Sequence, residues 1–84
     1  MIAAPMDWNE AAEDLLEQIL LSTPLPVRRQ IEGQIRQIAE SMVDGRVGTN
    51  TVVQAWIEAT PEALREELPR QMEKMGLDPE EFGL

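Results

Sequence analysis

The chain has 84 residues, 43% of them hydrophobic, and its 16 acidic and 7 basic side chains give a net charge of −9 near neutral pH. This length predicts one small domain, and this composition is sufficient for a single core. There is no cysteine and no histidine, which excludes disulfides, thiolate metal sites, cysteine nucleophiles and the commonest general base and metal ligand. The negative charge repels the phosphates of nucleic acids and of anionic membranes, so we expect neither as a partner.

Hydropathy along the chain predicts a cytoplasmic protein without membrane insertion. No apolar run approaches the roughly 20 residues that span a bilayer, and the first residues lack the basic start and long apolar stretch of a signal peptide. We expect a flexible N-terminus over residues 1–6 and a single helical domain over residues 7–76. Residues 77–84 are expected to form a frayed tail or a single turn.

The first predicted helix covers residues 8–21. Asp7, followed three residues later by Glu10, matches a capping box at its start. Apolar residues then recur at helical spacing: Trp8, Ala12, Leu15, Leu16 and Ile19. Pro24 and Pro26 form a stiff elbow after this helix, because each proline restricts the residue before it to extended conformations.

A second helix follows the elbow, with Pro26 suited to its first position. It has the strongest helical signal in the chain, an apolar stripe at three- and four-residue steps: Val27, Ile31, Ile35, Ile38 and Met42. Gly33 lies in the middle of this helix and marks either a close helix contact or a tolerated defect, at a cost of about 1 kcal/mol relative to alanine. The glycines of residues 44–48 end the helix.

A short third helix is predicted to follow the cap residue Thr49 and to end near Ala59. Its apolar face consists of Val52, Val53, Trp56 and Ile57. The β-branched run of residues 51–53 would also suit a strand.

A fourth helix is predicted to start at residues 60–62, where a threonine, a proline and an acid follow one another. Leu64, Leu68, Met72 and Met75 line one of its faces, and Gly76 ends it. Pro69 lies inside this pattern and is expected to kink or split the helix, since it cannot donate a backbone hydrogen bond. The predicted fold class is therefore all-α: a small bundle of three to four short helices, the last kinked at Pro69. We find no internal repeat.

The acidic residues do not predict a metal or catalytic site. No segment has the alternating oxygen ligands and turn glycine of a calcium loop. Paired carboxylates need a cleft that shifts their pKa values, which three or four short helices rarely enclose. We therefore expect no catalytic residue, no cofactor and no metal, and interpret the chain as a module that binds a protein partner rather than as an enzyme.

Arginines give the first candidate for a partner-binding surface. Arg28, Arg29 and Arg36 gather on the second helix of an otherwise acidic chain, and a guanidinium grips carboxylates and phosphates through its planar fork. Alternatively, these arginines balance the acids of neighbouring helices inside the molecule.

The alternative interface is the last helix, through Leu68, Met72 and Met75, because methionine recurs at adaptable binding surfaces. The same residues also suit a core. Tryptophan is common at binding hot spots, but in a chain with one phenylalanine and no tyrosine we expect Trp8 and Trp56 to belong to the core.

Residues 8–55 carry a series of short motifs. They are, in order, Trp8-x3-Ala12-x3-Leu16, Pro24-x2-Val27-Arg28, Ala39-Glu40 and Gly48-Thr49-x2-Val52-Val53-x-Ala55. With the motifs in this order, the chain resembles the small helical domain at the C-terminal end of one of the subunits of light-independent protochlorophyllide reductase.

The resemblance implies an accessory role. The parent enzyme is nitrogenase-like and reduces protochlorophyllide in chlorophyll synthesis with electrons from iron–sulfur clusters, which the larger body of the enzyme holds. The expected function is therefore a non-catalytic interaction or regulatory module of this kind. The alternative is a helical adaptor or structural subunit unrelated to tetrapyrroles, which docks a partner through its terminal Met-rich helix.

Overall fold

A computed structural model describes residues 7–84. The predicted flexible N-terminus, residues 1–6, lies outside the described residues. In chain order the described elements are β1 (Asp7–Trp8), α1 (Glu10–Leu21), α2 (Leu25–Met42), β2 (Arg46–Val47), α3 (Thr49–Ala59), the 3-10 helix η1 (Glu62–Glu67), α4 (Leu68–Lys74) and the 3-10 helix η2 (Pro79–Phe82). The predicted small all-α bundle is confirmed.

The start of α1 differs from the prediction. Asp7 and Trp8 do not cap or begin the helix but pair in parallel with Arg46 and Val47, and the Asp7 carboxylate lies 2.9 Å from the Arg46 guanidinium. Asn9 is the N-cap instead, and its side chain accepts a hydrogen bond from the backbone N–H two residues later at 2.8 Å. The capping box at Asp7 is therefore wrong, because strand pairing holds this residue outside the helix.

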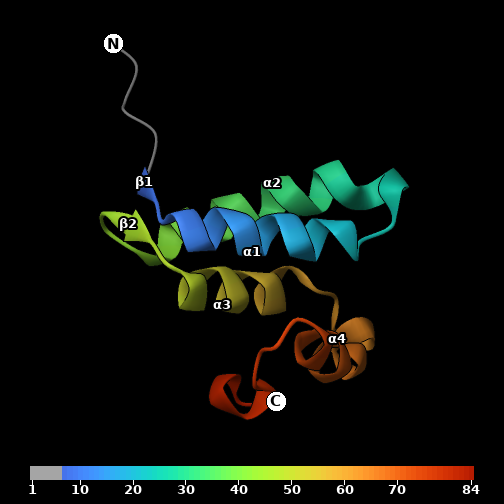
Figure 1. Cartoon of the computed structure of the whole chain (residues 1–84). Helices are drawn as coiled ribbons and strands as arrows, with labels where there is room; N and C mark the ends of the chain where they lie inside the picture. Colours follow the sequence, from blue (N-terminus) through green and yellow to red (C-terminus); the bar gives the residue numbers. More distant parts are fainter. Residues whose placement is uncertain (1–6) are drawn as a thin grey trace.

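The first three helices form the main body of the fold. In Figure 1, α1 lies in front of α2 and α3 runs beneath them, and α2 packs most extensively on α3. The side chains that these helices and β2 bury together are Ala12, Leu15, Leu16, Ile19, Ile35, Ala39, Val47, Val52, Val53, Ala55 and Trp56. Residues 51–53 belong to α3, so the strand alternative for this run is wrong.

The apolar stripe of α2 is buried only along its middle. Ile35 is fully buried, whereas Val27 and Met42 at the two ends are 42% and 46% exposed. With 18 residues α2 is longer than α3, which has 11. At about 1.5 Å per residue, α2 is longer than the helix on which it packs, and Val27 and Met42 lie near its two ends.

The last helix is split close to Pro69, as predicted. Residues before it form η1, and α4 begins at Leu68 with Pro69 in its first turn. Gly76 ends α4 with a left-handed φ of +80°, and the backbone N–H of Leu77 donates to the Met72 carbonyl at 2.8 Å. This is the hydrogen-bond pattern of a glycine C-cap. The chain then makes the 3-10 turn η2, which buries Pro79.

A short motif occurs twice, contrary to the prediction of no internal repeat. Residues 23–28 and 60–65 both read Thr-Pro-x-x-Val/Leu-Arg. In each copy the threonine hydroxyl donates to the carbonyl four residues earlier, at 2.8 and 2.7 Å. The guanidinium Nε of the arginine then donates to the threonine carbonyl, at 3.3 Å for Arg28 and 3.1 Å for Arg65. The chain thus contains two helix–elbow–helix units with the same elbow chemistry.

Candidate functional site

The three arginines predicted on α2 do not form one open patch. Arg28 donates to the Thr23 carbonyl from both Nε and Nη2. Arg36 is held by two carboxylates, those of Glu13 at 2.9 Å and Glu32 at 3.3 Å. Arg29 is exposed, and within residues 7–84 it makes no hydrogen bond or ion pair. Two of the three guanidinium groups are therefore engaged within the molecule.

Arg36 also connects the helices to the first tryptophan. Its guanidinium lies 4.8 Å from the centre of the Trp8 ring, and the indole N–H donates to the Glu40 carboxylate at 2.9 Å. Partial burial alone would lower the pKa of Arg36, but hydrogen bonds and charge from Glu13 and Glu32 outweigh burial and raise it. The two carboxylates therefore stabilise the charged form of the guanidinium. This cluster joins β1, α1 and α2 and is a structural connection.

The alternative interface on α4 is largely internal. Leu68 is 2% exposed and Met72 is fully buried, so both belong to the core. Met75 is half-buried and packs against that core, but it also lines a surface hollow. Of the three predicted residues, only Met75 is accessible to a partner.

A groove runs between the two elbows. One hollow, of about 440 Å³, separates the first elbow and α2 from the second elbow and η1; its lining residues are Ser22, Thr23, Pro24, Val27, Ile31, Trp56, Thr60, Pro61, Leu64, Glu67, Leu68 and Gln71. A second hollow, of about 450 Å³, continues between the end of α1 and α4; it is lined by Gln18, Leu21, Ser22, Gln71, Lys74 and Met75. Because both hollows share Ser22 and Gln71, they form one surface, which we call the elbow groove.

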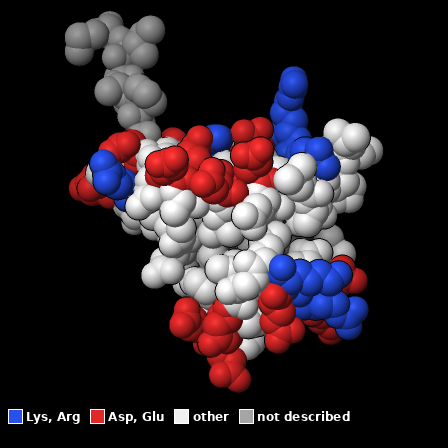
Figure 2. Space-filling model, in the orientation of Figure 1, with Lys and Arg blue, Asp and Glu red and all other residues white. Residues whose placement is uncertain are grey.

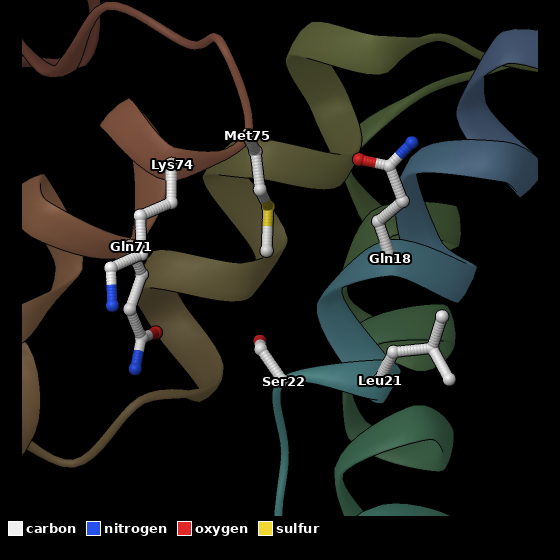
Figure 3. A pocket seen from close by; sticks show the side chains of 6 residues that line it. All are labelled: Gln18, Leu21, Ser22, Gln71, Lys74 and Met75. Atoms are coloured by element: carbon white, nitrogen blue, oxygen red, sulfur yellow. The ribbon is translucent and has the colours of Figure 1, made fainter.

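The second half of the elbow groove is shown in Figure 3. Gln71, Lys74 and Met75, from α4 and its C-cap, line it on one side, and the Met75 side chain extends into the space between α4 and the end of α1. The lining of this half therefore includes an amide, an ammonium and a thioether.

Exposed apolar side chains gather at the elbow groove. Leu21, Val27 and Leu64 line it and are 68%, 42% and 55% exposed. Val27 and Leu64 occupy the same position in the two copies of the elbow motif. Clustered exposed apolar residues with a polar rim mark interaction surfaces. The elbow groove has this composition.

Few charged side chains line the groove. Its lining contains one acid, Glu67, and one base, Lys74. Figure 2 shows acidic side chains gathered at opposite ends of the molecule, with a wide uncharged belt between them. The arginines of the two elbows point their guanidinium groups at backbone carbonyls, so they contribute hydrogen bonds within the fold rather than an open basic site.

Helical periodicity does not reveal the groove, because its apolar residues fit helical stripes. Val27 and Leu64 both lie on the apolar face of a predicted helix. The repeated Thr-Pro-x-x-Val/Leu-Arg motif was the available signal, since it places both residues at equivalent points just after a helix end.

Within residues 7–84 no cluster of three or more acidic side chains could hold a metal ion. None of the helices in this part of the chain has the length and apolarity needed to cross a membrane. Searches of protein-family models, curated proteins and solved structures find no match to this chain.

Proposed function

We propose that the chain is a non-catalytic interaction module that binds a protein partner in the elbow groove. The observation that carries this proposal is the gathering of Leu21, Val27 and Leu64, each more than two-fifths exposed, around one groove. Exposing large apolar side chains to water is unfavourable by about 25 cal/mol per Å². A partner that covered all three would gain that free energy.

The polar groups of the groove support binding rather than catalysis. Thr23 and Thr60 each precede a proline, and the hydroxyl of each donates to a carbonyl of the preceding helix. Both hydroxyls are therefore engaged in hydrogen bonds within the fold, and neither is hydrogen-bonded to a base, which a hydroxyl nucleophile requires. Glu67 and Lys74 belong to different hollows, so the lining does not pair an acid with a base.

The resemblance to the accessory domain of protochlorophyllide reductase supplies a biological setting for this proposal. Several of its motif residues build the core, since Ala12, Ala39 and Ala55 are fully buried. One motif, Pro24-x2-Val27-Arg28, contributes two lining residues and an elbow arginine. We therefore propose an accessory or regulatory module of a nitrogenase-like reductase in tetrapyrrole synthesis, with the groove as its docking surface.

The second candidate is an adaptor unrelated to tetrapyrroles. It is favoured by the part that α4 takes in the groove, where Gln71, Lys74 and Met75 form one wall. Both candidates use the same surface and differ in the protein that binds it. Genes that neighbour this one would separate them, because pigment-synthesis or nitrogenase-like neighbours favour the first.

A peptide-display selection tests the shared part of both proposals. A library of random peptides is selected on the wild-type chain and then measured on two variants, Leu64→Asp in the groove and Met42→Asp as a control. Met42 is similarly exposed, at 46%, but lies at the opposite end of α2 from the groove. Selected peptides should lose binding to Leu64→Asp and keep binding to Met42→Asp. Equal binding to both variants and the wild type would contradict the docking role of the groove.

A further inference from the structure

We infer that the occupant of the elbow groove is an amphipathic α-helix with a basic polar face. This inference rests on the proposed function and adds the chemistry of the partner. It follows from two properties of the groove: the hydrogen-bonding state of its backbone and the sign of the charges around it.

The backbone of the elbows has few free hydrogen-bonding groups for an extended peptide. Peptides that bind as strands depend on main-chain hydrogen bonds to an exposed sheet edge. Here Pro24 and Pro61 have no N–H, and the carbonyls of Thr23 and Thr60 already accept from arginine side chains. An occupant must therefore satisfy its own backbone. A helix does so, because its hydrogen bonds run within the segment.

The side chains of the groove suit a helix that presents an apolar stripe. Val27 of α2 and Leu64 of η1 line the same hollow, together with the largely buried Trp56. The apolar surface continues past the shared residue Gln71 to Leu21 and Met75 in the second hollow. An elongated apolar groove of this kind accommodates side chains at positions i, i+3 or i+4, and i+7 of a bound helix.

The charges around the groove favour a basic polar face. Glu67 lines the groove, and two further acids of η1, Glu62 and Glu66, are exposed. Lys74 and its exposed neighbour Arg70 oppose them at one end only. The whole chain carries a charge of −9, which attracts a cationic partner over a distance of about one Debye length.

The same charge argues against a second copy of this chain as occupant. Two copies would bring two charges of −9 together, and a large net charge keeps small proteins apart. We therefore expect a monomer, and analytical ultracentrifugation of the wild type and of Leu64→Asp checks this. A wild-type dimer that Leu64→Asp dissociates would overturn the inference in favour of self-association.

Three labelled peptides of about five turns test the partner chemistry by fluorescence anisotropy at low salt. The first has leucines on one face and lysines and arginines on the other. The second keeps the leucines and replaces the bases with glutamates. The third has the composition of the first in scrambled order, so that its charge is unchanged but its apolar stripe is lost. Only the first should bind the wild-type chain tightly, and salt should weaken that binding.

Variants of the chain then locate the binding. Leu64→Asp, and independently Val27→Asp, should weaken binding of the basic helix by at least about tenfold, while Met42→Asp leaves it unchanged. Glu67→Lys should weaken binding and Lys74→Glu should strengthen it, because both charges line the groove. Circular dichroism of each variant verifies that it is folded. Because Val27 and Leu64 lie on different elements, the test does not depend on the stability of one variant alone.

The outcomes separate this inference from the proposed function. If the acidic or the scrambled peptide binds as tightly as the basic helix, the inference is wrong. If display selects non-helical or uncharged peptides whose binding Leu64→Asp abolishes, the inference is wrong but the groove is still a docking surface. If neither selected peptides nor the basic helix distinguish Leu64→Asp from the wild type, both the inference and the proposed function are wrong.

Discussion

The two tryptophans illustrate how far one residue's role follows from its sequence context. Trp56 lies on the apolar face of α3 and is 5% exposed, as the helical periodicity predicts. Trp8 lies in β1 rather than on the core-facing stripe of a helix, and it is only half-buried. The prediction of a largely buried core residue is therefore confirmed for Trp56. It is wrong for Trp8, which is only half-buried and whose indole contacts Glu40 and Arg36.

Trp8→Phe should lower the free energy of unfolding by about 1–2 kcal/mol. The change keeps an aromatic ring beneath the Arg36 guanidinium but removes the N–H that donates to Glu40 at 2.9 Å. Urea denaturation measures the loss. Glu40→Ala should have a similar effect, and the double variant should lose less than the sum of the two single losses, because both break the same bond. Strictly additive losses would show that this hydrogen bond contributes nothing.

Gly33→Ala should raise the free energy of unfolding by about 0.5–1 kcal/mol. Gly33 lies inside α2, and a Cβ placed there meets no atom within 4 Å. This geometry decides between the two alternatives that the sequence left open: the glycine is a tolerated defect and not a close helix contact. Thermal or urea denaturation checks the gain, and a less stable variant would indicate a contact absent from this structure.

At the scale of elements, the ends of helices were the least predictable from sequence. Pro69 splits the last helix and Gly76 ends it, as expected, because proline and glycine act on the local backbone alone. Asp7 has the residue type of a cap, but pairing with Arg46 across the fold overrides that local preference. Helical periodicity also does not reveal the elbow groove, because it places Val27 on an apolar stripe; the repeated Thr-Pro-x-x-Val/Leu-Arg motif is the one signal that indicates the groove.

Arg28 and Arg29 are adjacent, but only the Arg28 guanidinium is hydrogen-bonded within the described fold. Arg28→Met keeps most of the aliphatic stem but removes both hydrogen bonds to the Thr23 carbonyl, so it should lower the free energy of unfolding by about 1–2 kcal/mol. Arg29→Met, the adjacent control, removes an exposed guanidinium and should leave stability unchanged. Guanidinium or urea denaturation compares them. If Arg29→Met were the more destabilising change, the proposed role of the elbow arginines would be wrong.

For the molecule as a whole, the fold should not depend on a metal ion. Its stability comes from one apolar core and from backbone hydrogen bonds at the helix ends. Circular dichroism should therefore record the same melting temperature with and without a chelator. A chelator-induced loss of helix would contradict this prediction.

We propose the elbow groove as the docking surface of the molecule. Amide chemical-shift mapping by NMR, during titration with the basic amphipathic peptide, tests it residue by residue. We expect the largest shifts at Leu21, Val27, Leu64 and Gln71, from both elbows and α4, and no shift at Met42. Shifts concentrated on the exposed arginine of α2, or spread evenly over the acidic surface, would contradict the claim.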